Sequence, residues 1–498
     1  MRLRNCLLID GTGASPRRED VCIQDGRFVA ACDGPVLDCR GLAVAPGFID
    51  AHSHSDLAAL RRPLEKVRQG VTAEVVGNCG FSAFPAIAPR APLHEFANGI
   101  LYGQGDWGWG SAREYLNSAA VSNTRIFSLV GHGTLRVAVA GNRQGPLSAR
   151  ELDRMEGLLD DALSAGAVGF STGLMYAPGS SAPAAELARL SCVVGRRGKL
   201  YATHMRDYSG RLVEAVDEQI ALARQAGCRL QISHLQAVGQ RFWKLQRIAL
   251  DHIEKAGIDI GFDCYPYLAG STVLTLFLPQ WVLDGGTDAL LERLRGPERV
   301  RIARETEELL AQTWADIFVS AAASGRNVGR SIEEIARERA CPPADTVLDL
   351  LLEEGGAVNV LEFNQSEANL RETLTHPLSI VISDGFYVSG RPHPRLAGTF
   401  PHLLGDIVRE RGWMSLPEAV RKITSAPATR FGLADRGRIR PGCIADLVVF
   451  DPAAIGSPAT FEAPELPPHG IHLVLREGML QFSSSLLDTL DTPGGNPA

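Results

Sequence analysis

Two histidines separated by one residue, His52 and His54, directly follow an apolar run at residues 45–49. Residues i and i+2 of a β-strand point to the same face, so these two imidazoles can bind one metal ion. The run carries no charged residue, which is typical of a strand buried on both faces of a parallel sheet. Taken alone, the segment leaves open a second interpretation, two unconnected histidines in a turn.

Other side chains that bind metals stand close to the ends of further apolar runs. In a (β/α)8 barrel, catalytic groups come from the C-terminal ends of several strands. Such a barrel would bring these side chains into one metal centre, a pattern that scattered core histidines would not produce. Singly, Cys79 is more typical of a buried structural thiol, and Asp384 is equally typical of a turn cap. In chain order the candidate ligands are His52, His54, Cys79, His204, His234 and Asp384.

The middle of the chain alternates strand-like and helix-like segments, which predicts an α/β fold with a parallel sheet. Eight strand candidates predict a (β/α)8 barrel of the TIM type. Helices are expected at residues 149–165, 183–197 and 211–226, with Pro183 at a first helical position. The expected strands are residues 45–49, 72–76, 126–130, 168–171, 200–203, 230–233, 258–263 and 379–383.

Short strand-like runs with Asp-Gly and Gly turns occur at both ends of the chain. We expect residues 1–44 and 430–485 to form one small β-sandwich domain, with the barrel at residues 45–429 inserted between them. Residues 273–375 exceed what one strand-to-helix connection needs, so a largely helical insertion is expected there. Residues 486–498 end in a Gly/Pro-rich run, which predicts a flexible tail.

Composition limits the class of protein. The 498 residues carry a formal net charge of −7 without a basic tract, so nucleic acid is not an expected partner. No apolar run approaches the roughly 20 residues that cross a membrane. The N-terminus is too polar for a signal peptide and the ten cysteines have no regular spacing, so free thiols in a cytoplasmic protein are expected. The oligomeric state stays open.

From about residue 1 to 480 the chain resembles the amidohydrolase superfamily, and more closely its branch of N-acyl-D-amino-acid deacylases, the D-aminoacylases. The resemblance rests on several motifs together, whereas two spaced histidines alone would mark only the superfamily. The motifs are Pro-Gly-Phe-Ile-Asp-Ala-His-Ser-His (46–54), Gly-Asn-Cys-Gly-Phe-Ser (77–82), Ser-Thr-Gly-Leu-Met-Tyr (171–176), Asp-Cys-Tyr-Pro-Tyr-Leu-Ala-Gly-Ser-Thr (263–272), Ser-Asp-Gly (383–385) and His-Pro-Arg (393–395).

The resemblance implies zinc as the cofactor. Many dinuclear relatives bridge two metals with a carboxylated lysine from strand 4, but residues 168–173 contain no lysine. In the deacylase branch a cysteine from strand 2 is a metal ligand instead. Carried over by motif, Cys79, His204 and His234 would hold one tight zinc, and His52, His54 and Asp384 would face a second, weaker site. Asp384 would also move the proton from the attacking water to the leaving nitrogen.

The implied reaction is hydrolysis of an N-acyl-D-amino acid to a carboxylate and a free D-amino acid. Tyr265, Ser271 and Arg395 would bind the α-carboxylate, which a guanidinium can hold in two parallel hydrogen bonds. Tyr176 would polarise the scissile carbonyl. Gln236 departs from the pattern, because close members carry lysine two residues after the strand-6 histidine. A neutral amide at that position weakens cationic recognition of the substrate.

The segment Thr-Val-Leu-Thr-Leu-Phe-Leu-Pro at residues 272–279 bears on the substrate side chain. It has no charge where selectivity for an acidic side chain would want an arginine, so apolar D-amino acids such as leucine, methionine or phenylalanine are expected. The alternative is that it merely begins a packed helix. Alternative functions are a cyclic amidase or a dipeptidase on the same scaffold. A non-catalytic binding relative should have lost ligands, and all six are present.

Overall fold

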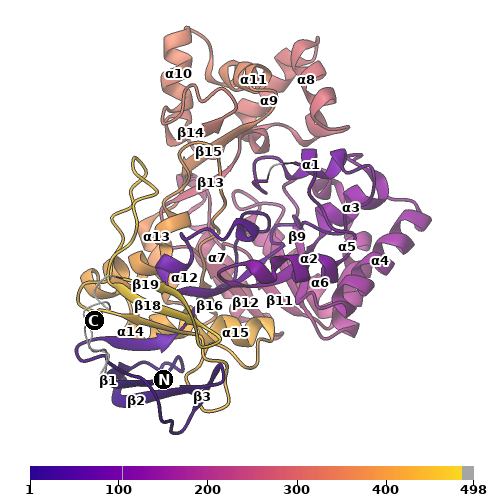
Figure 1. Cartoon of the computed structure of the whole chain (residues 1–498). Coiled ribbons are helices and arrows are strands. Elements are labelled where there is room, and N and C mark those ends of the chain that lie inside the picture. Colours follow the sequence, from indigo (N-terminus) through magenta and orange to yellow (C-terminus); the bar gives the residue numbers. More distant parts are fainter. Residues whose placement is uncertain (104, 485–498) are drawn as a thin grey trace.

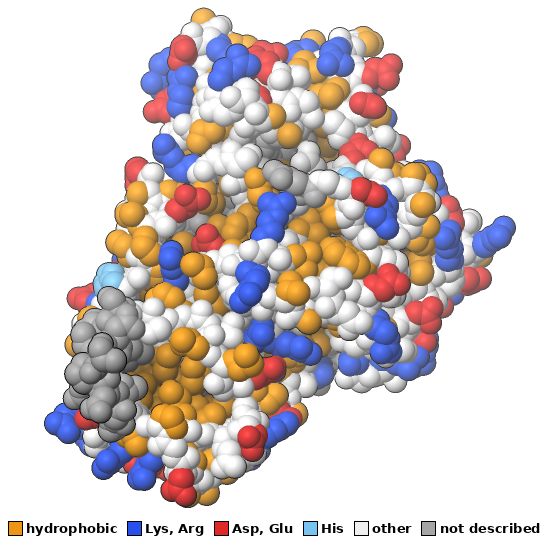
Figure 2. All heavy atoms as spheres, viewed as in Figure 1, with side chains coloured by type: hydrophobic (Ala, Val, Ile, Leu, Met, Phe, Trp, Pro, Cys, Tyr) orange, Lys and Arg blue, Asp and Glu red, His pale blue; other side chains and the backbone are white. Residues whose placement is uncertain are grey.

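The computed structural model describes residues 1–103 and 105–484, and the tail expected at 486–498 lies outside the described residues. Figure 1 shows a barrel flanked by helices, a sheet that joins strands from the beginning of the chain to strands that end at Ser483, and an insertion that stands above the barrel. On the face shown in Figure 2, basic and acidic side chains are interspersed, and hydrophobic side chains gather below the insertion and over the β-domain. No helix among the described residues combines the length and the apolarity that a membrane span requires.

Eight parallel strands form the barrel, in the order β16-β12-β11-β10-β9-β8-β7-β6. Its two ends meet beyond the strands, where Ser53 bridges Gly385 in parallel. The nearly closed barrel confirms the predicted fold class. The strands are β6 (Phe48–Asp50), β7 (Val71–Val76), β8 (Arg125–Gly131), β9 (Gly169–Gly173), β10 (Leu200–His204), β11 (Arg229–Ile232), β12 (Ile260–Cys264) and β16 (Ser379–Val381).

Helices connect the barrel strands and cover them. The helix expected at residues 149–165 is α4 (Ala149–Ser164), and it begins at a capping box. In this box the Ser148 hydroxyl accepts a hydrogen bond from the Glu151 amide, and the Glu151 carboxylate accepts one from the Ser148 amide. Pro183 was expected inside the next helix, but its ψ of 154° is extended and it is the N-cap residue. The helices are α1 (Ala91–Ala97), α2 (Ala112–Ser118), α3 (His132–Ala140), α4 (Ala149–Ser164), α5 (Ala184–Arg196), α6 (Leu212–Ala226), α7 (Leu245–Glu254), α12 (Glu367–Thr375), α13 (Arg395–His402), α14 (Leu416–Lys422) and α15 (Ser425–Phe431).

Both ends of the chain form one further sheet, which confirms their expected pairing. Its order is β19-β18-β17-β5-β1-β2-β3, and β4 also pairs with β1. The antiparallel contact between β5 and β17 joins the N-terminal segment to the C-terminal one. The strands are β1 (Arg2–Leu8), β2 (Arg17–Gln24), β3 (Arg27–Val29), β4 (Val36–Asp38), β5 (Ala43–Pro46), β17 (Leu447–Phe450), β18 (Ile471–Arg476) and β19 (Met479–Ser483).

The apolar run at residues 45–49, expected as one strand, is divided between the two sheets. Its first part belongs to β5, which ends at Pro46, and its second part begins β6 at Phe48. At the break, a side chain on Gly47 would overlap the side chain of Thr72. The prediction of a single strand was therefore wrong, because the chain passes from one sheet to the other at Pro46 and Gly47. The last residue that pairs within the β-domain is Pro46, two residues after the expected boundary at residue 44.

The insertion between β12 and β16 contains a sheet as well as helices, whereas a largely helical segment was expected. Strands β13, β15 and β14 form an antiparallel sheet that begins before residue 273, because β13 pairs with β15. The segment expected to shape the substrate side-chain pocket continues from β13 into a short 3-10 helix, Leu274–Phe277. The elements are β13 (Ala269–Val273), α8 (Thr287–Arg295), α9 (Arg299–Leu309), β14 (Ile317–Ala322), α10 (Ile332–Arg339), α11 (Pro343–Glu353) and β15 (Val358–Phe363).

Phe48 packs at the junction between the barrel and the β-domain. Its ring is fully buried, 6.0 Å from the ring of Phe400 in α13 and 6.4 Å from the ring of Phe450 in β17. We expect Phe48→Ala to lower the free energy of unfolding by about 3–5 kcal/mol, because it opens a cavity in this junction. Urea denaturation measures the change. The control Val300→Ala, at a side chain that is 81% exposed, should stay within about 0.5 kcal/mol of the parent. A loss for Phe48→Ala as small as the control's would contradict this packing.

Candidate metal centre

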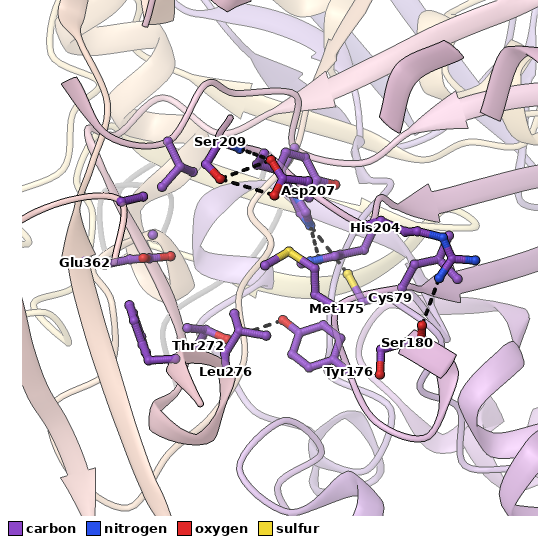
Figure 3. A pocket seen from close by; sticks show the side chains of 18 of the residues that line it. Cys79, Met175, Tyr176, Ser180, His204, Asp207, Ser209, Thr272, Leu276 and Glu362 are labelled. Carbon is purple, nitrogen blue, oxygen red and sulfur yellow. Dashed lines mark hydrogen bonds between the residues drawn. The ribbon is translucent and has the colours of Figure 1, made fainter. Parts of the chain in front are cut away.

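The structure brings the six candidate ligands together at the mouth of the barrel, and all six are buried. Cys79 stands at their centre, with its Sγ 3.3 Å from His52 Nε2 and 3.6 Å from His234 Nε2. Figure 3 shows Cys79 and His204 on one side of the adjoining pocket. Within each of two groups the donor atoms lie within 4.8 Å of one another: His52, His54, Cys79 and Asp384 in the first, and Cys79, His204 and His234 in the second.

Unusual backbone conformations aim three of these ligands. Cys79, His234 and Asp384 have φ angles of 51°, 33° and 49°. This left-handed conformation is uncommon for residues other than glycine and recurs at functional sites. The Cys79 loop also fills the space above β9, since a side chain on Gly173 would overlap the Cys79 carbonyl oxygen. A long side chain at the end of β9 therefore has no room, which agrees with the missing lysine of strand 4.

Asp263, at the end of β12, supports two of the histidines from behind. Its Oδ1 accepts a hydrogen bond from the His234 amide at 2.6 Å and lies 3.4 Å from His52 Nδ1. His52 Nε2 is thereby left to face Cys79 and Asp384. A carboxylate behind a ligating histidine fixes the ring orientation and raises its basicity.

A buried ion pair anchors the segment that carries Asp384. Lys66 Nζ donates to Asp50 Oδ2 and to Ser383 Oγ, both at 2.7 Å. The Ser383 amide donates to Asp50 Oδ1 at 2.9 Å, and the Gly385 amide donates to Ser383 Oγ at 3.0 Å. The residues on both sides of Asp384 are thus tied to the end of β6. Sequence reasoning missed this role of Lys66, and the one signal for it was a charged residue, Asp50, at the end of a buried strand.

The environment favours the metal-binding protonation states of four of the six candidate ligands: His54, His204, His234 and Asp384. Burial lowers the pKa of His234 to about 4 and, together with the charge of His234, lowers the pKa of His204 well below its usual range. Burial acts to raise the pKa of Asp384, but Arg395 and His52 outweigh it and hold that pKa well below its usual range. Burial raises the pKa of the Cys79 thiol. The neutral imidazoles of His204 and His234 and the ionised Asp384 carboxylate are ready to bind a cation. Burial acts to lower the pKa of His52, but the charges of Cys79, Asp384 and Asp263 outweigh it and hold that pKa well above its usual range. His52 and the Cys79 thiol would therefore release their protons on binding.

The donor set suits zinc by its chemistry. Thiolate and imidazole are the ligands that zinc prefers, and a site with three protein ligands keeps a fourth tetrahedral position for water or substrate. The group formed by Cys79, His204 and His234 is of this kind. Magnesium or calcium would favour oxygen donors, of which the cluster has only the Asp384 carboxylate.

A cavity of about 630 Å³ adjoins the cluster, and all five residues expected to bind substrate line it: Tyr176, Gln236, Tyr265, Ser271 and Arg395. The buried guanidinium of Arg395 lies 4.5 Å above the ring of Tyr265, and its Nη2 is 2.9 Å from Asp384 Oδ2. The Tyr265 hydroxyl donates to Gln236 Oε1 at 2.9 Å. On the other side, the Tyr176 ring lies 4.9 Å from the His204 ring. The cavity therefore begins at the candidate metal ligands and extends under the insertion.

The sequence profile described as "Amidohydrolase family" matches residues 35–480. The chain belongs to the amidohydrolase family. It is 36% identical to the N-acyl-D-aspartate deacylase of Alcaligenes xylosoxydans xylosoxydans, over 95% of this chain and 89% of the relative. The crystal structure of N-acyl-D-glutamate deacylase from Bordetella bronchiseptica, complexed with zinc and a phosphonate mimic of the tetrahedral intermediate, is 34% identical, with a TM-score of 0.83 over 97% of this chain and 96% of that one. A D-aminoacylase structure with a binuclear metal centre, which one metal activates and a second attenuates, is also 34% identical, with a TM-score of 0.81 over 96% and 95% of the two chains.

Among the polar residues of this amidohydrolase's cavity that were not anticipated is an acid from the insertion. Glu362 lies in β15 and lines the cavity, where Figure 3 shows it across from Cys79 and His204. It reaches this place because β15 pairs with β13, with Glu362 opposite Gly270. No local sequence signal marks such a residue, since its position depends on strand pairing within the insertion.

Lys66→Met is expected to lower the free energy of unfolding by about 3–5 kcal/mol, because it leaves the Asp50 carboxylate buried without its cation. The double variant Lys66→Met with Asp50→Asn removes that charge and should recover part of the loss. Urea denaturation of the metal-loaded protein measures both. A Lys66→Met variant as stable as the parent would show that the ion pair does not hold this part of the barrel.

Proposed function

We propose that this amidohydrolase is a zinc-dependent deacylase that hydrolyses N-acyl-D-amino acids to a carboxylate and a free D-amino acid. The observation that carries the proposal is the convergence of two ligand groups on Cys79, beside a cavity that contains a buried arginine. Relatives named as deacylases of N-acyl-D-aspartate and N-acyl-D-glutamate, and as a D-aminoacylase, support it at 34–36% identity over nearly the whole chain.

The proposed zinc ligands follow the two groups in the structure. Cys79, His204 and His234 would hold the tight zinc, and His52, His54 and Asp384 would form a second, weaker site. When bound, zinc supplies Lewis acidity to the amide carbonyl and to water. Side chains of the protein would carry out the proton transfer and bind the substrate.

Asp384 is the proposed proton carrier. Its Oδ1 lies 3.2 Å from His52 Nε2 and 3.3 Å from His54 Nε2, while Arg395 contacts Oδ2. These neighbours keep the carboxylate ionised at neutral pH, as a base requires. Asp384 would take a proton from the attacking water and deliver it to the departing nitrogen, which leaves as a neutral amine.

Arg395 is the proposed anchor for the α-carboxylate, together with Tyr265 and Ser271. Its Nε and Nη1 have no hydrogen-bond partner among residues 1–103 and 105–484, although they are buried. A buried guanidinium with free donors favours an anionic ligand, because leaving such donors unpaired is costly. Tyr176 would donate to the scissile carbonyl, and Gln236 would contact the substrate less strongly than a lysine.

The proposed preference is for apolar side chains. Leu276, Phe277 and Leu278 line the cavity, as the uncharged segment at 272–279 suggested. Arg206 also lines it, but its Nε donates to Glu218 at 3.0 Å and its terminal nitrogens donate to backbone carbonyls. That arginine is therefore engaged and is a poor partner for an acidic substrate side chain.

A panel of N-acetyl-D- and N-acetyl-L-amino acids tests the proposed reaction. We expect the zinc-loaded protein to release free amine from the D-leucine, D-methionine and D-phenylalanine derivatives, while the L-derivatives and N-acetyl-D-aspartate react at least about tenfold more slowly, the effect of about 1.4 kcal/mol in transition-state binding. Failure to release amine from any D-derivative with zinc bound would contradict the proposed function. Faster turnover of the aspartate derivative would contradict only the apolar preference.

The roles of Asp384 and Cys79 are separable by metal content. Asp384→Asn should lower kcat by about 10²–10⁴-fold, the range for loss of a general acid–base group, while one zinc stays bound. Cys79→Ala should lose the tight zinc as well as activity, because it removes the thiolate that belongs to both ligand groups. Elemental analysis and amine release measure both, with the exposed Asp106→Asn as control. Near-parental turnover of Asp384→Asn would refute the proposed role.

A further inference from the structure

The cavity contains a carboxylate that the proposed reaction does not use. Glu362 Oε2 accepts one hydrogen bond, from Gln312 Nε2 at 2.8 Å. Among the described residues, Glu362 forms no ion pair, and Arg395, whose positive charge acts on it, contacts Asp384 instead. Glu362 is half-buried, and an acid without a cation inside a substrate cavity favours a ligand that supplies the missing charge.

The other oxygen of Glu362 faces the part of the cavity near Tyr265. A methyl group on Gly270 would lie 3.1 Å from Glu362 Oε1 and 3.4 Å from the Tyr265 hydroxyl. The absence of a side chain at Gly270 therefore lets the carboxylate and the phenol approach the same space. Tyr265 in turn donates to the neutral amide of Gln236. This end of the cavity thus brings a carboxylate oxygen and a phenol oxygen to the same space.

Two tyrosines of the cavity, Tyr176 and Tyr265, are close enough to both Asp384 and Glu362 for the charges of these acids to act on them. Burial raises the pKa of Tyr176, and the charges of Cys79, Asp384 and Glu362 raise it further. Burial likewise raises the pKa of Tyr265, whose hydroxyl is also under the influence of Asp384 and Glu362. Figure 3 shows Tyr176, Thr272 and Leu276 along the wall that leads from Cys79 toward Glu362. A substrate whose amide bond lies at the metal ligands can therefore extend toward the Glu362 carboxylate.

We propose that Glu362 binds a protonated amine of the substrate. The proposal rests on the deacylase function and specifies its substrate class: an acylated D-amino acid that carries an ammonium group at the end of an apolar stem. The ammonium has two sources, the side chain of a basic D-amino acid or the α-amino group of an aminoacyl group, as in a dipeptide with a D-residue at its C-terminus. Both place a primary ammonium, a compact donor of three hydrogen bonds, against an acceptor.

The surroundings of Glu362 fit this ligand. Burial raises the pKa of Glu362 to about 7, because it destabilises the ionised carboxylate. A bound cation would stabilise this ionised form. The apolar side chain of Leu276 can pack against the methylene stem while the charged end reaches the carboxylate. An acidic substrate side chain would meet a like charge there.

Two matched substrate pairs, measured at neutral pH with zinc-loaded protein, test the proposal. N-acetyl-D-lysine is compared with N-acetyl-D-norleucine, which lacks the terminal ammonium. Glycyl-D-leucine is compared with N-propionyl-D-leucine, in which a methyl group replaces the ammonium. We expect kcat/KM to favour the ammonium substrate of one pair by about tenfold or more, the effect of one hydrogen bond to a charged group. The pair that shows the preference identifies the source of the amine.

Glu362→Gln should abolish that ratio, because the amide keeps the shape but not the charge. Glu308→Gln is the matched control, since Glu308 is an exposed acid on the rim of the same cavity, and it should keep the ratio. A preference for the uncharged substrate in both pairs, or a ratio that survives Glu362→Gln, overturns the proposal.

Calorimetric titration of Asp384→Asn with the same four compounds measures binding without turnover. Tighter binding of an ammonium compound, lost when Glu362→Gln is added, supports the proposal even if no substrate in the panel is hydrolysed. Absence of turnover for every D-derivative contradicts the deacylase function instead. If the ammonium and uncharged compounds bind equally tightly, the proposed role of Glu362 is overturned whatever the turnover. Failure of the deacylase function and failure of the Glu362 proposal are therefore distinguishable.

Discussion

The closure of the barrel between the segments that follow β6 and β16 determines the rest of the site. The Asp384 amide donates to the His52 carbonyl at 2.9 Å, and the His54 amide donates to the Gly385 carbonyl at 3.0 Å. These two bonds place the histidine pair and the acid on one rim, although more than 300 residues separate them. The Lys66–Asp50 ion pair stabilises the same contact between the two segments, because Asp50 also accepts a hydrogen bond from the Ser383 amide. Without this closure, Asp384 would not reach the histidines, and the cluster would lose its only carboxylate.

The insertion gives the cavity its second half. The barrel rim supplies the candidate metal ligands and Arg395, while β13 and β15 contribute Ser271 and Glu362. In the proposed reaction the two halves have separate tasks: the rim would position the reacting amide, and the insertion would contact the rest of the substrate. The structure places an acid, Glu362, in the part of the wall that the insertion contributes, and a neutral amide, Gln236, in contact with Tyr265. In the proposed function, substrate choice therefore depends on the insertion as well as on the barrel rim.

Sequence patterns sufficed to predict that the six candidate ligands lie together, because each one stands within a few residues of the end of an apolar run and parallel strands end on one rim. The same reasoning supported the barrel and the pairing of the chain ends. It failed where the outcome depended on contacts between distant segments. The run at 45–49 was expected as one strand, yet Pro46 pairs with the C-terminal segment and Phe48 with β7. The position of Lys66 depends on Ser383, far along the chain, and the position of Glu362 depends on strand pairing within the insertion. Local periodicity in the sequence encodes neither contact.

Anomalous diffraction at the zinc absorption edge, from crystals grown with one equivalent of zinc, tests the central claim most directly. The account predicts the strongest peak within bonding distance of Cys79 Sγ and of the His204 and His234 imidazoles, with a fourth position open toward the cavity. A peak held by His52, His54 and Asp384 alone, or one outside the cluster, would contradict the assignment of the tight site and the proposed role of Asp384 that depends on it.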